Sequence, residues 1–330
     1  MISIIIPVYN CQLFLRDCLE SILKQAYQDF EVICIDDKSS DNSPHILQEY
    51  AARDSRIKFI QAEKNSGSGP VRNRGLAEAR GEYILFCDAD DIYPLSALGR
   101  MYAALTQSDC DICAGNIKLM SHDMSYPIPQ PSLILATHID EADVVSPFDC
   151  PQLWFPWFHP RFMFKKSFLV QNNIYYPNLL RGQDPPMLAK ALCLAKTIAV
   201  IPDTVYKYRT STSQKCSHLQ FIDYMAHIKE TLKIFDSFGH TKQGDLYIKM
   251  MAHFADTFST FKAFSPNDRR VMTNLYLNIL KERNIPEDIP PYYFDKHTKQ
   301  RLSLMNYGIV IYGLYRIYTL YWEKIKKYIL

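Results

Sequence analysis

Blocks of apolar and polar residues alternate along the first part of the chain, and each block has the length of a single strand or helix. The apolar run from Ile2 to Pro7 is nearly continuous, which is typical of a strand buried on both faces of a parallel sheet. A second such run, Phe30 to Ile35, ends at Asp36 and Asp37. Between them, apolar residues recur at helical spacing, and Asn10 is the expected N-cap of that helix.

The same alternation continues to residue 86. Ser43 and Pro44 have the residue types that begin a helix, and a third strand is expected over Ile57 to Ala62. The loop 65–70 opens a third helix, and a fourth strand follows at 83–86. This βαβαβαβ order predicts an α/β fold with a mostly parallel, twisted sheet and helices on both faces.

The rest of the chain predicts three further regions. A helix over 95–105 and a strand over 111–119 extend the sheet, and the Pro- and Ser-rich stretch 121–150 leaves the core. Helical spacing throughout 219–285 predicts a helical accessory region. We therefore divide the chain into an α/β domain at 1–215 (halves 1–100 and 101–215), a helical region at 216–290, and a linker with an amphipathic C-terminal helix at 291–330.

Composition narrows the function classes. The 330 residues are 48% hydrophobic and 22% charged with a net charge of +2, so neither disorder nor nucleic-acid binding is indicated. Nine cysteines include one Cys-x-x-Cys pair, Cys110 and Cys113, for which two buried thiols are favoured over a zinc site. Free thiols and the absence of a signal peptide indicate a reducing, cytoplasmic compartment.

Polar residues gather at the carboxyl ends of the predicted strands. These residues are 7–10, the pair Asp36 and Asp37, and 88–91. Open α/β sheets bind their ligands at the edge where the carboxyl ends of the strands lie. Asp88 and Asp90 project to the same side of an extended chain, where a divalent cation would relieve their repulsion. We therefore expect Mg²⁺ or Mn²⁺ with a diphosphate; the alternative is a solvated acidic turn.

Three segments carry a resemblance to a known family. SIIIPVYN, FEVICIDDKSSDNS and NSGSGPVRNRGLAEARGEYILFCDADD resemble the family 2 glycosyltransferases, which have the GT-A fold. The match is close over 1–100 and looser to about 210. The resemblance implies an inverting transferase that moves a sugar from a nucleotide diphosphate, with UDP-sugar expected, to a hydroxyl of a glycan. It also implies bacterial lipopolysaccharide, lipooligosaccharide or capsule synthesis.

The resemblance assigns the donor side. Pro7 and Tyr9 would line the base pocket, with Tyr9 stacked on the base. Asp37 would accept a hydrogen bond from the base, and Asp36 would support that loop or the ribose. Lys38 stands where the family usually has glycine, so the turn there is expected to be built differently.

The family motif Asp-x-Asp falls on Asp88 and Asp90, with Asp90 as the more direct metal ligand. Arg72 would contact the diphosphate or the sugar, and Asp91 would lie near the sugar. Arg209, in a Tyr-x-Tyr-Arg segment, could reach the diphosphate but is more simply structural.

The acceptor side rests on fewer residues. Asp184, in Gly-Gln-Asp, resembles the family's catalytic base, and it also fits the start of a helix. Trp154 and Trp157 belong to an aromatic cluster that would pack on an acceptor sugar; a core wall is the alternative. No role follows for His159. The wheel of 302–330, with Arg316 opposite an apolar face, predicts a helix docked on the inner face of the cytoplasmic membrane, or else packed as core.

Competing functions lack their motifs. A NAD-linked dehydrogenase would have Gly-x-Gly-x-x-Gly after the first strand, where residues 7–10 are Pro-Val-Tyr-Asn. A sugar nucleotidyltransferase would have a glycine- and lysine-rich loop there for a triphosphate. An inactive sugar-nucleotide-binding module would have a broken site, whereas Asp37, Asp88, Asp90 and Asp184 are all present.

Overall fold

A computed structural model describes residues 1–127, 138–154, 158–210 and 218–254, together with part of 268–284. Trp157, the linker and the whole of the predicted membrane-docking helix at 302–330 lie outside the described residues. Their predicted roles therefore stay predictions.

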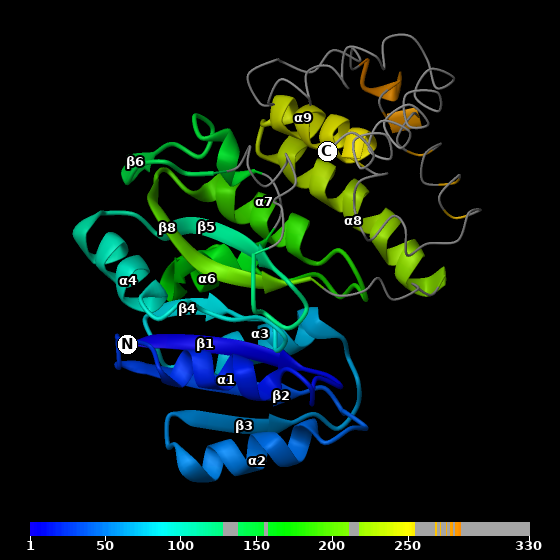
Figure 1. The fold of residues 1–330 in the computed structure, drawn as a ribbon. Helices are drawn as coiled ribbons and strands as arrows, with labels where there is room; N and C mark the ends of the chain where they lie inside the picture. Colours follow the sequence, from blue (N-terminus) through cyan, green and yellow to red (C-terminus); the bar gives the residue numbers. More distant parts are fainter. Residues whose placement is uncertain are drawn as a thin grey trace, which may run out of the picture.

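The described residues form one mixed sheet of eight strands in the order β3-β2-β1-β4-β7-β5-β8-β6 (Figure 1). The strands are β1 (Ile2–Val8), β2 (Phe30–Asp36), β3 (Ile57–Gln61), β4 (Tyr83–Phe86), β5 (Ile112–Met120), β6 (Asp143–Val145), β7 (Phe162–Lys165) and β8 (Ile198–Arg209). Strands β1 to β4 pair in parallel, which confirms the predicted first half of the fold. The α/β class is therefore confirmed.

Helices connect these strands and continue beyond them. They are α1 (Leu15–Leu23), α2 (Ser43–Arg53), α3 (Ser68–Glu78), α4 (Ala97–Gln107), α6 (Lys166–Gln171), α7 (Asp184–Leu194), α8 (His218–Ser237) and α9 (Thr241–Phe254). Two single turns, η1 (Pro151–Leu153) and η2 (His159–Arg161), precede β7. The predicted boundaries of the N-terminal strands and of α2 lie within two residues of those observed.

The second half of the sheet is less regular than the sequence indicated. β7 runs antiparallel to both of its neighbours, β4 and β5. Part of the stretch 121–150, expected to leave the core, rejoins the sheet as β6, a mostly exposed strand that pairs antiparallel with β8 at the sheet edge. Cys113 lies in β5 and Cys110 just before it, and both thiols are buried.

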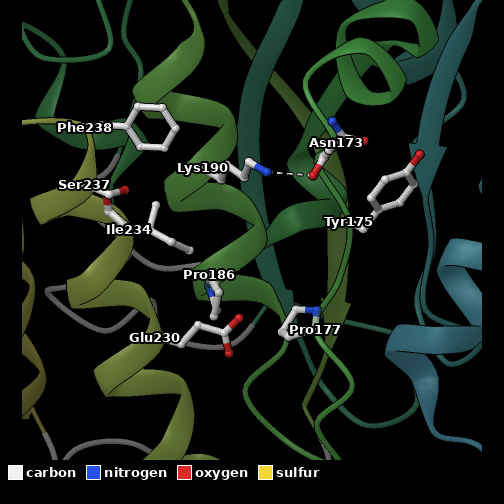
Figure 2. Close-up of a pocket in the computed structure, with 9 residues that line it drawn as sticks. All are labelled: Asn173, Tyr175, Pro177, Pro186, Lys190, Glu230, Ile234, Ser237 and Phe238. Carbon is white, nitrogen blue, oxygen red and sulfur yellow. Dashed lines mark hydrogen bonds between the residues drawn. The ribbon is translucent and has the colours of Figure 1, made fainter.

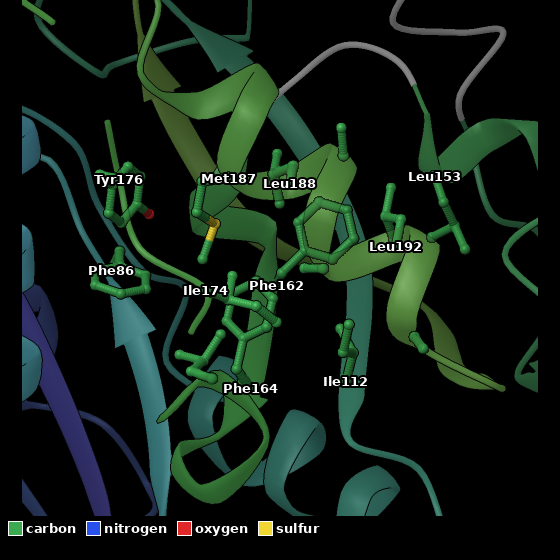
Figure 3. Close-up of a cluster of buried hydrophobic side chains, with 14 of the residues drawn as sticks. Phe86, Ile112, Leu153, Phe162, Phe164, Ile174, Tyr176, Met187, Leu188 and Leu192 are labelled. Atoms are coloured by element: carbon green, nitrogen blue, oxygen red, sulfur yellow. The ribbon is translucent and has the colours of Figure 1, made fainter. Parts of the chain in front are cut away.

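Alternate residues of the central strands enter two separate cores. Ile4 and Ile6 face one cluster, which contains the inner faces of α1, α2 and α4. Ile5 faces the other, which contains α3, α7 and residues of α8. Figure 3 shows α7 side chains packed on those of β4, β5 and β7 in this second cluster. The predicted accessory helices therefore share a core with the sheet, through α8 and α7.

Two predictions about turns are wrong. Asn10 is not the N-cap of α1, which begins five residues later at Leu15. Its φ is 51°, and its side chain accepts a hydrogen bond from the Ser40 backbone at 2.8 Å, so it joins two loops. Lys38 has φ 66°, the left-handed conformation that glycine favours. The turn is thus not rebuilt to suit lysine; it imposes a strained backbone on it.

Candidate functional site

The three polar strand ends lie at one edge of the sheet, as predicted. The parallel register places Val8 of β1 beside Asp36 of β2 and Ile5 beside Phe86 of β4, so residues 9, 37 and 88 continue from adjacent strands. Tyr9 is 50% exposed, which leaves its ring free to stack on a ligand. Pro7 precedes it, half-buried, in β1.

Asp36 and Asp37 hold the loops around this edge. Both are buried. Asp36 accepts a hydrogen bond of 3.2 Å from the backbone of Ser39. Asp37 accepts hydrogen bonds of 2.8 Å from the backbones of Ser66 and Gly67, just before α3. Asp36 therefore supports its loop, and Asp37 fixes the start of α3; a contact of either with a nucleotide stays a prediction.

The loop after β4 is tied to the end of β8. Asp91 is 1% exposed, and it accepts hydrogen bonds from the Tyr206 hydroxyl at 2.8 Å and the Arg209 backbone at 2.7 Å. The Tyr206 hydroxyl also accepts one from the Asp88 backbone at 3.1 Å. Arg209 donates from Nε to the Asp90 carbonyl at 2.6 Å. Asp91 and Arg209 thus fix the loop that carries Asp88 and Asp90, the structural role that the sequence favoured for Arg209.

Asp88 and Asp90 are the two carboxylates of this loop that would hold a cation, and Asp88 also pairs with Arg72 at 2.6 Å. Burial and the neighbouring charge of Asp88 raise the pKa of Asp90 to about 6, so a positive charge beside it would favour its ionised form. Among the described residues, no three or more His, Cys, Asp or Glu side chains are arranged so that together they could hold a metal ion. Two carboxylates with a diphosphate nevertheless suit Mg²⁺ or Mn²⁺, which take oxygen ligands and commonly keep only one or two from the protein.

Asp184 is the first residue of α7, and its carboxylate is not used as a helix cap. The N-cap is Gln183, with no capping side-chain hydrogen bond. Instead, Asp184 Oδ2 lies 3.0 Å from His159 Nδ1, and Oδ1 lies 3.7 Å from Arg72 Nη1. Burial opposes the charge, but His159 and Arg72 hold the pKa of Asp184 below its ordinary value. The carboxylate is therefore ionised at neutral pH, as a base must be.

Arg72 lies between the two acidic sites. Its guanidinium donates a hydrogen bond of 2.6 Å to Asp88 Oδ1 and packs 5.1 Å from the centre of the Tyr176 ring. The segment before α7 approaches α3 closely here, because a Cβ on Gly69 would lie 2.7 Å from the Pro177 carbonyl oxygen. Arg72 thereby links the loop after β4 to the start of α7.

Trp154, which was predicted to contact the acceptor sugar, packs inside the protein. Trp154 is 7% exposed and packs on Phe148 and Phe235, with its indole N–H donated to the Pro147 carbonyl. The structure thus favours the core-wall alternative for Trp154, because its ring has no open face for a sugar.

A cavity of about 410 Å³ lies beside α7, between α8 and residues 173–177. In Figure 2, Lys190 of α7 reaches toward Asn173, to whose carbonyl it donates a hydrogen bond of 2.8 Å, while Glu230 and Phe238 line the α8 side. None of the lining residues is among the predicted site residues. Within the part of the chain described here, no helix has the length and apolar character needed to cross a membrane.

Sequence reasoning missed the contacts made by three side chains. The sequence marked Tyr206 only as part of a Tyr-x-Tyr-Arg pattern, and nothing in it marked Tyr176 as a site residue. His159 stood at the end of the aromatic cluster, just before Pro160, but its partner Asp184 is distant in sequence. A local sequence pattern cannot predict a contact between two residues so far apart along the chain.

The sequence model of the protein family "Glycosyl transferase family 2" matches residues 3–170 of this chain. Among curated proteins, "Glycosyltransferase GlyG" of Streptococcus pneumoniae is 31% identical over 215 residues, covering 63% of this chain and 70% of that protein. The "Poly(ribitol-phosphate) beta-glucosyltransferase" of Bacillus spizizenii is 35% identical over 211 residues, covering 63% of this chain but 32% of that protein.

Solved structures show the same fold. Staphylococcus aureus TarS in complex with UDP superimposes with a TM-score of 0.67 at 23% identity, covering 87% of this chain and 81% of that one. Its complex with UDP-GlcNAc gives a TM-score of 0.59 at 20% identity, with coverages of 84% and 91%. The GT-A fold expected from the sequence is therefore confirmed.

Proposed function

This chain belongs to glycosyl transferase family 2, and we propose that it moves a sugar from a nucleotide diphosphate, a UDP-sugar by preference, to a hydroxyl of a glycan with inversion at the anomeric carbon. The observation that carries the proposal is the position of Arg72 between Asp88 and Asp184. It places the proposed metal-diphosphate loop and the proposed base next to each other. A donor and an acceptor held at these two sites would therefore meet.

The residues divide the reaction between them. Asp184 takes the proton of the acceptor hydroxyl as its oxygen attacks the anomeric carbon. The bond from that carbon to the diphosphate oxygen breaks on the opposite face, and the diphosphate leaves with the electron pair, so the configuration inverts. A divalent cation held by Asp88 and Asp90 would neutralise charge on the leaving diphosphate. Tyr9 and Pro7 would hold the base, and Arg72 would assist the diphosphate.

The acceptor class rests on the relatives. Proteins named for glucosyl and N-acetylglucosaminyl transfer to poly(ribitol-phosphate) match 63% of this chain. We therefore propose a role in bacterial cell-surface polysaccharide synthesis, with a glycan or lipid-linked glycan as acceptor. The proposed docking of 302–330 on the inner membrane face would bring the enzyme to such an acceptor. Sedimentation with anionic vesicles tests it, and full-length protein that ignores vesicles of every charge would contradict it.

A donor screen tests the function. Purified protein is incubated with UDP-, GDP- and dTDP-sugars, with Mn²⁺, with Mg²⁺ or with EDTA, and release of nucleoside diphosphate is measured with and without poly(ribitol-phosphate). We expect release from one or two UDP-sugars, increased by acceptor and abolished by EDTA. The anomeric configuration of the product, read by NMR, tests inversion.

Two other outcomes would replace the proposal. An inactive binding module would bind UDP in calorimetry without turning over any donor. A sugar nucleotidyltransferase would release pyrophosphate from UTP and a sugar 1-phosphate.

A further inference from the structure

His159 is a buried histidine in direct contact with the proposed base. It begins the single turn η2, just before β7, and is 1% exposed. Its Nδ1 atom lies 3.0 Å from Asp184 Oδ2. Among the described residues neither ring nitrogen has a hydrogen-bond partner of good geometry. The ring is shielded from solvent, and the carboxylate of Asp184 is the polar group that lies within reach of its Nδ1 atom.

Aromatic rings fix where this imidazole points. The edge of Phe86 lies against it with ring centres 6.0 Å apart, and Tyr176 does so at 5.6 Å. Phe86 and Tyr176 also pack on each other at 5.0 Å, and Figure 3 shows these two rings side by side. Burying an imidazole among aromatic rings is unfavourable unless its nitrogens find partners. The arrangement is therefore one that keeps Nδ1 directed at Asp184.

We propose that His159 is the positioning residue of Asp184. In the reacting complex Nδ1–H donates a hydrogen bond to Oδ2, which fixes the rotation of the carboxylate as it receives the acceptor's proton. The inference rests on the proposed function, in which Asp184 is the base. Catalytic hydrogen bonds are often poorly aligned without substrate and tighten when it binds, so the present contact needs only a small adjustment.

Other neighbours cannot orient the carboxylate in this way. Arg72 lies 3.7 Å from Oδ1, and its shorter contact of 2.6 Å is with Asp88. Without His159 the Asp184 side chain could turn about its terminal bond, and the proportion of carboxylates in the reactive orientation would fall.

Kinetics of His159 variants test the proposal in the full chain. His159→Leu fills the space but removes the donor, and we expect kcat for transfer to fall about 10- to 100-fold, the effect of losing a hydrogen bond to a charged group. The donor KM and the Kd for UDP should stay unchanged. His159→Asn places an amide N–H near the former Nδ1 and should restore most of the lost rate. As a control, His240→Leu makes the same change at a histidine that stacks on Phe148 instead, and kcat should stay at the wild-type value.

A double variant separates positioning from a structural role. If His159 acts through Asp184, His159→Leu should lower the residual rate of Asp184→Asn little further, because residues that act as a unit are not additive. If His159→Leu lowers kcat by the same factor in the Asp184→Asn variant as in the wild type, the proposal is overturned. A full kcat in His159→Leu, or a loss of UDP binding that matches the loss of rate, would also overturn it. If the wild type itself turns over no donor, the proposed function fails instead.

Discussion

The guanidinium of Arg72 and the carboxylate of Asp88 form an ion pair of 2.6 Å, with the arginine 6% and the aspartate 30% exposed. Burial alone would disfavour a charged arginine, but Asp88 and Asp184 hold its pKa above the ordinary value. The pair connects α3 to the loop after β4. One buried cation thus balances carboxylates from both proposed halves of the site.

Removing the Arg72 charge should cost stability as well as activity. Arg72→Met leaves Asp88 and Asp184 without their shared cation, and we expect the free energy of unfolding to fall by about 3 kcal/mol, the low end for a broken buried pair. Urea unfolding measures it. Arg100→Met is the matched control, because Arg100 pairs with Asp203 while 58% exposed, and it should leave the free energy of unfolding close to that of wild type. Equal losses for the two variants would contradict the buried role of Arg72.

Asp184→Asn should separate chemistry from donor binding. The amide keeps the size of the carboxylate but cannot take the acceptor's proton, so kcat should fall about 10²- to 10⁴-fold. The Kd for UDP, measured by calorimetry, should barely change. A variant that loses UDP affinity but keeps its rate at saturating donor would move Asp184 to the donor site.

Sugar transfer should depend on a divalent cation that Asp90 helps to hold. Asp90→Ala removes one of the two carboxylates expected to hold the cation, and transfer should be lost while the circular dichroism spectrum stays native. Asp140→Ala, at an exposed aspartate, is the control and should keep full activity. Wild-type transfer that persists in excess EDTA would show that the loop is an acidic turn without a metal.

Stability should fall in acid because of His227. Burial lowers the pKa of this histidine of α8 from 6.5 to about 4. Between these values the unfolded chain binds the proton and the folded chain does not, so stability is complete above pH 6.5 and is lost as the pH falls toward 4. The loss amounts to about 3 kcal/mol. Urea midpoints across this range measure it, and His227→Gln should flatten the slope; an unchanged slope would assign the acid sensitivity elsewhere.

Lys38 offers a stabilising substitution. Its φ of 66° is costly for a residue with a Cβ, and the side chain is exposed. Lys38→Gly should therefore raise the free energy of unfolding by up to about 1 kcal/mol, the strain being partly offset by the greater freedom of glycine in the unfolded chain. Lys38→Ala keeps the Cβ and should leave the midpoint near that of wild type. A glycine variant no more stable than the alanine variant would mean that the turn carries no strain.

The sequence by itself determined the part of the fold that depends on local pattern. Continuous apolar runs such as 2–7 and 30–35 can only be buried between two layers, and the helices between them force parallel pairing. Parallel strands end at one edge, so the order of elements placed Asp88 and Asp90 at the same edge of the sheet as Asp36 and Asp37, although not which strand lies between them. Asp184 was recognisable because a Gly-Gln-Asp-Pro run marks both a motif and a helix start.

Tertiary structure decided what depends on contacts between distant segments. The antiparallel insertion of β7, the return of 143–145 to the sheet and the burial of Trp154 under α8 follow from how whole elements pack, not from any local spacing. The same holds for the contact of His159 with Asp184, the ion pair of Arg72 with Asp88 and the bond of Tyr206 to Asp91. Local pattern reports which face of an element is apolar. Which side chain it meets is set by the packing of the complete core, where many residues must fill one volume together.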